Sequence, residues 1–115
     1  MTRTLAQFAA DCGGRLAGAD RAWSAVSTDT RRIGAGELFV DDPLRALQQA
    51  ARAVRSRFGG PVIGVAGSNG KTTCKEMIAA ILGERGATLA TRGNLNNHIG
   101  VPLTLLRLEA THRHA

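Results

Sequence analysis

The alternation of apolar and polar residues predicts a helix, a strand, a tight turn and a second helix in the middle of the chain. Apolar residues recur at helical spacing over residues 44–58, and they follow Asp42, a good N-cap, and Pro43, which suits the first helical position. The β-branched apolar run 62–66 predicts a buried parallel strand. Helical spacing then returns over residues 71–82. This order of elements predicts an α/β fold.

Shorter elements are predicted on either side of this unit. Residues 4–12 form a helix with apolar side chains on one side. Two short strands are expected, near residues 16–17 and over residues 22–27. After the second long helix, Gly86 serves as the C-cap glycine, and residues 87–91 form the next parallel strand. That strand completes a βαβ unit.

The turn between the predicted strand and the second helix has the composition of a phosphate site. This glycine loop, residues 67–73, reads Gly-Ser-Asn-Gly-Lys-Thr-Thr. Glycines let successive backbone N–H groups point at one anion, and the helix dipole adds positive potential there. Lys71 can reach the β- and γ-phosphates of a nucleotide, and the Thr72 hydroxyl can bind Mg²⁺. The G-x-x-G-K-T-T spacing is tighter than the usual phosphate loop, and the alternative is a glycine-rich turn with a solvated lysine.

Three further polar segments each allow two interpretations. Residues 27–32 are rich in hydroxyls and arginine, so they could grip a diphosphate or form a turn with a surface arginine. The asparagine loop, residues 92–102, holds three asparagines in four residues and follows the strand beside the glycine loop. Its amides could reach phosphates or a second substrate, or they could simply hold a turn. His112 and His114 could be metal ligands, but a frayed, solvated tail is favoured.

The amino-acid composition limits the classes of molecule that the chain is expected to bind. The 115 residues carry a net charge of +6, spread without a block of like charge, and include one Trp, three Phe and no Tyr. Nucleic acid is therefore not an expected partner, because the aromatic platforms that stack on bases are missing. Cys12 and Cys74 lack metal-ligand spacing, and Cys74 is expected to be a small buried residue. With no signal peptide and no apolar run of membrane-spanning length, a soluble, reducing, cytoplasmic setting is expected.

Two stretches resemble a known family. Residues 62–77 and 91–106 are similar to the Mur ligases, the ATP-dependent amide ligases that build the peptidoglycan precursor. The second stretch points to the branch of the family that adds D-alanyl-D-alanine to UDP-N-acetylmuramoyl-tripeptide. Residues 27–31 and 36–40 look like the family's uridine-nucleotide contact.

The resemblance implies a role for individual residues. ATP would be bound by Gly67, Ser68, Asn69, Gly70, Lys71, Thr72 and Thr73. Lys71 would neutralise the transferred phosphoryl group, and Thr72 would bind Mg²⁺. The substrate would be contacted by Thr28, Thr30 and Arg31 at its UDP moiety and by Asn94 and Asn97 at its muramoyl-peptide. The family reaction makes an acyl phosphate, which the amine of D-alanyl-D-alanine then attacks.

The resemblance also implies a domain layout. Residues 1–40 would be part of the N-terminal UDP-substrate domain, residues 41–60 a linking helix, and residues 61–115 the start of a P-loop parallel-sheet ATPase domain. The family continues past position 40 for a few dozen residues that are missing here, and past position 115 with its Mg²⁺-binding glutamate. The alternative function is therefore a truncated nucleotide-binding fragment without ligase activity. The oligomeric state is left open.

Overall fold

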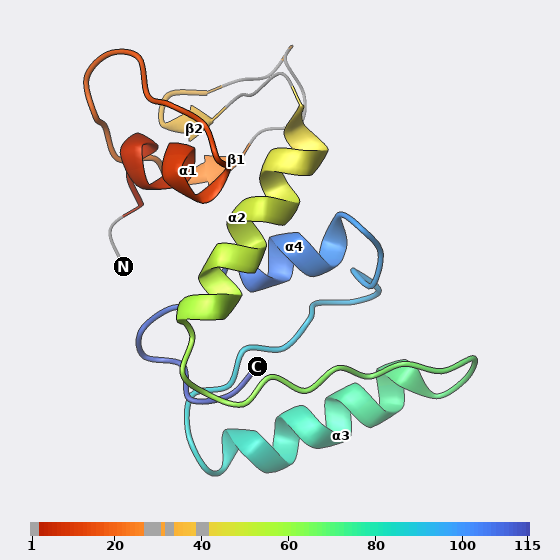
Figure 1. Cartoon of the computed structure of the whole chain (residues 1–115). Helices are drawn as coiled ribbons and strands as arrows, with labels where there is room; N and C mark the ends of the chain where they lie inside the picture. Colours follow the sequence, from red (N-terminus) through yellow and green to blue (C-terminus); the bar gives the residue numbers. More distant parts are fainter. Residues whose placement is uncertain (1–2, 27–30, 32–33, 39–41) are drawn as a thin grey trace.

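The computed structural model describes residues 3–26, 31, 34–38 and 42–115. Its elements in chain order are α1 (Leu5–Asp11), β1 (Ala25–Val26), β2 (Glu37–Leu38), α2 (Pro43–Arg57), α3 (Lys71–Gly83) and α4 (Gly100–Leu105). Figure 1 shows α2 running through the middle of the molecule, with β1 and β2 near its start and with α1 and α4 beside it. Helix α3 lies apart, at the other end of the molecule from β1 and β2.

Helix α2 forms where its sequence signals predict it. The Asp42 carboxylate accepts a hydrogen bond from the amide of Arg45 at 3.2 Å, and Pro43 takes the first helical position. Small and branched residues face inward along the helix, and those buried are Ala46, Leu47, Ala50, Ala51 and Val54. The two alanines at positions 46 and 50, in addition to the predicted apolar positions, give neighbouring elements room to approach the helix closely.

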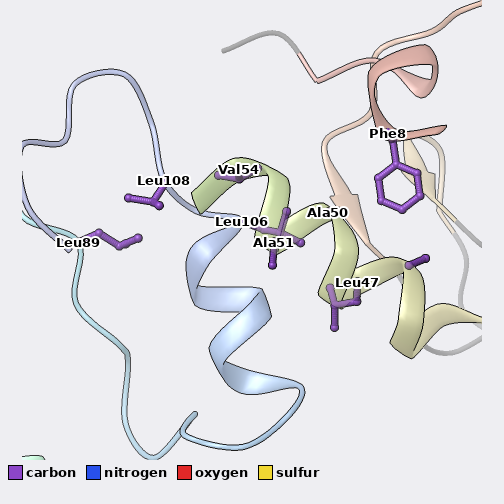
Figure 2. Packing of buried hydrophobic residues seen from close by; sticks show 9 residues of the cluster. Phe8, Leu47, Ala50, Ala51, Val54, Leu89, Leu106 and Leu108 are labelled. Carbon is purple, nitrogen blue, oxygen red and sulfur yellow. The ribbon is translucent and has the colours of Figure 1, made fainter. Parts of the chain in front are cut away.

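The hydrophobic core lies around α2, between α1 and α4. Figure 2 shows side chains of α1 and α2 together with Leu89, Leu106 and Leu108 from later in the chain, with Phe8 at one end of the cluster and Leu89 at the other. Leu108 is the most deeply buried of them, with 1% of its surface exposed. Phe8 packs edge-to-face on Trp23, with ring centroids 5.5 Å apart and an interplanar angle of 81°. Alanine and leucine fill most of this core, as the shortage of aromatic residues requires.

Helix α1 is fastened to α2 by both polar and apolar contacts. Asp11 accepts two hydrogen bonds of 2.8 Å from the guanidinium of Arg57, in the last turn of α2. These bonds lower the pKa of the Asp11 carboxyl and outweigh its burial, while the Arg57 pKa is raised. The half-buried Cys12 thiol donates a hydrogen bond to the Ala46 carbonyl at 3.3 Å, and burial raises the pKa of this thiol. The predicted helix over residues 4–12 is thus confirmed, with Thr4 as its N-cap.

Extended segments form two small parallel arrangements. β1 and β2 pair in parallel, with Ala25 opposite Glu37. At the α3 end, residues 113–115 lie between two other segments: Ala115 exchanges hydrogen bonds with Pro61 and Ile63 at 3.1 and 2.8 Å. On the other side, Leu89 donates to the His114 carbonyl at 2.9 Å, within a parallel bridge between Thr88 and His114. The segments predicted to be neighbouring strands, 62–66 and 87–91, are therefore separated by the end of the chain.

Several expectations for these segments are wrong. Residues 62–66 are extended but not buried, and Ile63 is 44% exposed, because only Ala115 pairs with their start. Residues 87–91 contribute a single bridge in place of a full strand, and no strand occurs at residues 16–17. Residues 112–115 are not a frayed tail, because His114 pairs in the bridge and the His112 ring accepts a 3.0 Å bond from Glu109.

Candidate functional site

The glycine loop has the backbone shape that its sequence requires. Gly70 is the N-cap of α3 with φ of 77°, and Gly67 has φ of 145°, both in a region that residues with a Cβ rarely adopt. The first hydrogen bond inside α3 runs from the Cys74 amide to the Gly70 carbonyl, at 2.9 Å. The amides that precede Cys74 have no intrahelical partner, as at any helix N-terminus. A row of free N–H donors and the positive end of a 13-residue helix therefore meet at this loop.

The side chains at the start of α3 face the loop and its surroundings. The Lys71 ammonium donates a 2.5 Å hydrogen bond to the Gly67 carbonyl, which bends the lysine back over the glycine loop. The Thr72 hydroxyl is exposed and lies 3.5 Å from the Asn94 side-chain oxygen. A cation, free amides and two side-chain oxygens thus come together, although Thr72 and Asn94 are 22 residues apart in the sequence.

A cavity of about 400 Å³ lies between α3 and the extended segments. Its lining is mainly apolar, with polar groups from Lys71 and Thr72 of the glycine loop and from Asn94 and Asn96 of the asparagine loop. The inner face of α3 contributes Lys71, Thr72, Lys75, Ile78, Ala79 and Leu82, and the facing segments contribute Val62, Ile63, Gly64, Val65, Thr88, Leu89, Ala90, Thr91, Gly93, Asn94 and Asn96. A pocket with an apolar lining and a few convergent polar groups is the kind of cavity that binds small molecules.

Lys75 is a member of this site that the sequence reasoning missed. Its ammonium donates to the Thr91 carbonyl at 2.7 Å and lies 3.4 Å from the Gly93 carbonyl. It also pairs with the Glu76 carboxylate at 2.9 Å, and only 16% of its side chain is exposed. The available signal was its spacing, because a residue four positions after Lys71 lies on the same helical face.

Asn97 has a structural contact of its own. Its side-chain oxygen accepts hydrogen bonds from the amides of Ile99 and Gly100, at 3.1 and 2.7 Å, and so holds the start of α4. Asn94 and Asn96 line the cavity beside it. The contact to muramoyl-peptide expected at Asn94 and Asn97 stays a prediction.

The residues expected to contact UDP are not among those that line this cavity, and the structure describes one of the three. Thr28 and Thr30 lie outside the described residues, and Arg31 is exposed. The expectation of a small buried residue at position 74 is wrong, because Cys74 is exposed on α3. Helix α3 buries none of its residues, and Met77 and Ile81 on its outer side are 60% and 65% exposed.

The described part of the chain contains no cluster of three or more His, Cys, Asp or Glu side chains that could hold a metal ion. Any cation at the glycine loop would depend on oxygen ligands such as the Thr72 hydroxyl. Across the same residues, no helix is both long and apolar enough to cross a membrane.

Comparison with known proteins places this geometry in a family. Residues 65–115 match the Mur ligase middle domain. The chain is 56% identical over 71 residues to the UDP-N-acetylmuramoyl-tripeptide–D-alanyl-D-alanine ligase of Bacillus subtilis, covering 62% of this chain and 16% of that one. It is 38% identical to the Escherichia coli ligase of the same name, covering 97% of this chain and 33% of that one. That alignment spans 151 positions, more than the 115 residues here, so part of the relative has no counterpart in this chain.

Solved structures of the same kind of ligase are similar to this chain over its whole length. A crystal structure of MurF from Acinetobacter baumannii superposes with a TM-score of 0.84 and 28% sequence identity, covering all of this chain and 35% of that one. The chain thus spans about a third or less of the proteins it is compared with here. The α/β architecture agrees with that of these relatives. From residues 65–115 and from the fold as a whole, the chain belongs to the Mur ligase family.

Proposed function

We propose that the chain belongs to an ATP-dependent amide ligase that adds D-alanyl-D-alanine to UDP-N-acetylmuramoyl-tripeptide in the synthesis of the peptidoglycan precursor. The reaction would take place in the cytoplasm. The terminal carboxylate of the tripeptide would attack the γ-phosphorus of ATP, so that ADP leaves and an acyl phosphate forms. The amine of D-alanyl-D-alanine would then attack the acyl carbon and expel phosphate. The named relatives, from Bacillus subtilis and Escherichia coli, carry these two substrates in their names.

The observation that carries this proposal is the geometry of the glycine loop. The helix N-terminus, the two glycines with positive φ and the Lys71 ammonium held over Gly67 make a cradle for a phosphate chain. Catalysis of phosphoryl transfer consists mainly of positioning and of charge stabilisation at the transferred group. In this proposal the loop amides orient the triphosphate, and Lys71 neutralises charge on the γ-phosphate.

Magnesium fits the donor set at this place. Mg²⁺ prefers oxygen ligands and is commonly held by one or two protein groups together with substrate phosphates. The Thr72 hydroxyl, with the Asn94 side-chain oxygen 3.5 Å away, supplies hard oxygen donors at the edge of the cradle. When bound, the ion would offset the negative charge of the phosphates. Thr72 is therefore the proposed ligand from this chain.

The second substrate is assigned to the two polar loops. Asn94 and Asn96 line the cavity, and the Asn94 side-chain oxygen lies 3.5 Å from the Thr72 hydroxyl, so they support a contact to the muramoyl-peptide near the phosphate cradle. For the UDP moiety, the assignment of Thr28, Thr30 and Arg31 rests on the sequence resemblance. The division into residues 1–40, 41–60 and 61–115 remains part of the same proposal, as does the P-loop character of the last segment.

A nucleotide-binding fragment without ligase activity is the competing function. Part of the Escherichia coli relative has no counterpart here, and that observation favours the fragment. Release of ADP is the discriminating measurement, with Mg²⁺-ATP, UDP-N-acetylmuramoyl-tripeptide and D-alanyl-D-alanine supplied together. Turnover that disappears in Lys71→Ala supports the ligase. Binding of ATP without ADP release supports the fragment, and no binding of ATP contradicts both.

A further inference from the structure

The chain contains two lysines, and both lie at the start of α3, four residues apart. Their surroundings differ. The Lys71 ammonium bonds one carbonyl, that of Gly67, within its own loop. The Lys75 ammonium has three acceptors, the carbonyls of Thr91 and Gly93 and the carboxylate of Glu76, for its three N–H donors.

Lys75 therefore has no donor left for a phosphate, although it lies in the same cavity. Its side chain is 16% exposed, so the ammonium is largely withdrawn from water and depends on these acceptors. A charge-assisted bond of 2.7 Å to a backbone carbonyl holds that stretch of backbone firmly. Thr91 immediately precedes the asparagine loop, and Gly93, 3.4 Å from the same ammonium, is the second residue of that loop.

Little else connects α3 to that loop. Helix α3 buries none of its residues, and its packing is open on the side of Met77 and Ile81. Within the described part of the chain, the side-chain bonds from α3 to the asparagine loop and to Thr91, the residue before it, are those of Lys75 and the weak 3.5 Å contact between Thr72 and Asn94. Lys75 is thus the main polar link between the helix that begins at the glycine loop and the loop across the cavity.

We propose that Lys75 is a positioning residue that fixes the start of the asparagine loop against α3, so that nucleotide bound at the glycine loop orders the loop proposed to meet the second substrate. Lys71 contacts phosphate, and Lys75 sets the distance between the two loops. The bonds from Lys75 to Thr91 and Gly93, called the tether below, are a property of the free chain. The ordering of the asparagine loop by bound nucleotide rests on the proposed nucleotide function.

Hydrogen exchange on the full chain tests the tether without nucleotide. In Lys75→Met we expect the amides of residues 92–97 to exchange about tenfold faster, because charge-assisted bonds to backbone are lost. Amides of α1 and α2 should be unaffected, which shows that the variant is folded. Lys75→Arg keeps the charge and its donors and should restore most of the protection. Arg85→Met is the matched control, since Arg85 is exposed just beyond α3 and its side chain makes no bond among the described residues.

Titration with Mg²⁺-ATP separates the roles of the two lysines. Lys71→Met should lose at least tenfold in ATP affinity, and Lys75→Met should stay within about threefold of the unmodified chain. ATP should slow exchange at residues 92–97 in the unmodified chain and fail to do so in Lys75→Met. Unchanged exchange in free Lys75→Met overturns the tether. Loss of ATP affinity equal to that of Lys71→Met makes Lys75 a phosphate ligand and also overturns it.

Acetylation of the unmodified chain provides a test that needs no variant. With only two lysines, each site is read directly by mass spectrometry, and Lys75 should react several-fold more slowly than Lys71 because its ammonium is shielded and fully bonded. Equal rates contradict the tether. Failure of the unmodified chain to bind ATP refutes the proposed function, and the exchange and acetylation experiments without nucleotide still decide on the tether.

Discussion

Replacing Gly70 by alanine is expected to weaken nucleotide binding without disturbing the core. Gly70 has φ of 77° at the N-cap of α3, and a left-handed backbone costs a residue with a Cβ about 1–2 kcal/mol. A Cβ added there would meet no atom within 4 Å, so steric overlap adds nothing to that cost. If ATP requires this loop shape, its affinity should fall about tenfold, since 1.4 kcal/mol corresponds to a factor of ten.

Gly83 offers a matched control at the other end of the same helix. It is the last residue of α3, and a Cβ there also meets no atom within 4 Å. Alanine at position 83 should stabilise the helix by about 0.5–1 kcal/mol, because glycine is the poorer helix former. Titration calorimetry with Mg²⁺-ATP, paired with hydrogen exchange in α3, measures both effects. Unchanged affinity in Gly70→Ala, or an equal loss in Gly83→Ala, would refute the role given to the loop backbone.

The remaining predictions concern stability. Leu47 is 4% exposed, so Leu47→Ala should lower the free energy of unfolding by about 2–5 kcal/mol. Met77 is 60% exposed, so Met77→Ala should change that free energy by less than about 0.5 kcal/mol. Equal losses of the two variants in denaturant melts would contradict the placement of the core on α2. Asp11→Asn should cost about 1 kcal/mol at neutral pH, because Arg57 is 40% exposed and water screens the pair. The pKa of Asp11 is lowered in the folded state, so its contribution is complete above the unfolded pKa of about 3.9 and is lost as pH falls through the folded value. Melting temperatures of the unmodified chain and Asp11→Asn should therefore converge below about pH 4, and a constant difference would contradict the assignment.

Local signals predicted the elements that do not depend on distant partners. Asp42 and Pro43 mark the start of α2 as the structure has it. The spacing of its apolar residues marks most of its inner face, but Leu44, which the same spacing places on that face, is 39% exposed. Gly70 and Lys71 likewise mark the start of α3, because a left-handed residue before a helix is a local requirement. The end of that helix was misplaced: its C-cap is Glu84, and Gly86 comes two residues later with φ of 153°.

Features that depend on pairing across the chain could not be predicted. Burial of the β-branched run 62–66 was inferred from its composition, yet burial of a parallel strand needs neighbours, and Ala115 supplies only the first pairing. The same bridge orders residues 112–115, which no local pattern indicates. Helix α4 is not among the predicted elements, although Asn97, three residues before Gly100, is a capping signal.

Most residues of the candidate site could be predicted from the sequence, but the distances between them could not. Lys71 and Thr72 were identified from the motif alone, since the motif itself carries the chemistry. The approach of Asn94 to within 3.5 Å of Thr72 was expected only as a convergence of loops. The Lys75 bond to Thr91 could not be predicted, because its acceptor is a backbone carbonyl, which every residue carries whatever its type.

The central claim is that residues 67–73 hold the phosphates of ATP. Titration calorimetry of the full chain with Mg²⁺-ATP, repeated with Lys71→Met, tests it most directly. The geometry predicts saturable binding in the unmodified chain and at least a tenfold weaker affinity in the variant. Binding of equal strength in both chains, or none in the unmodified chain, would contradict the claim.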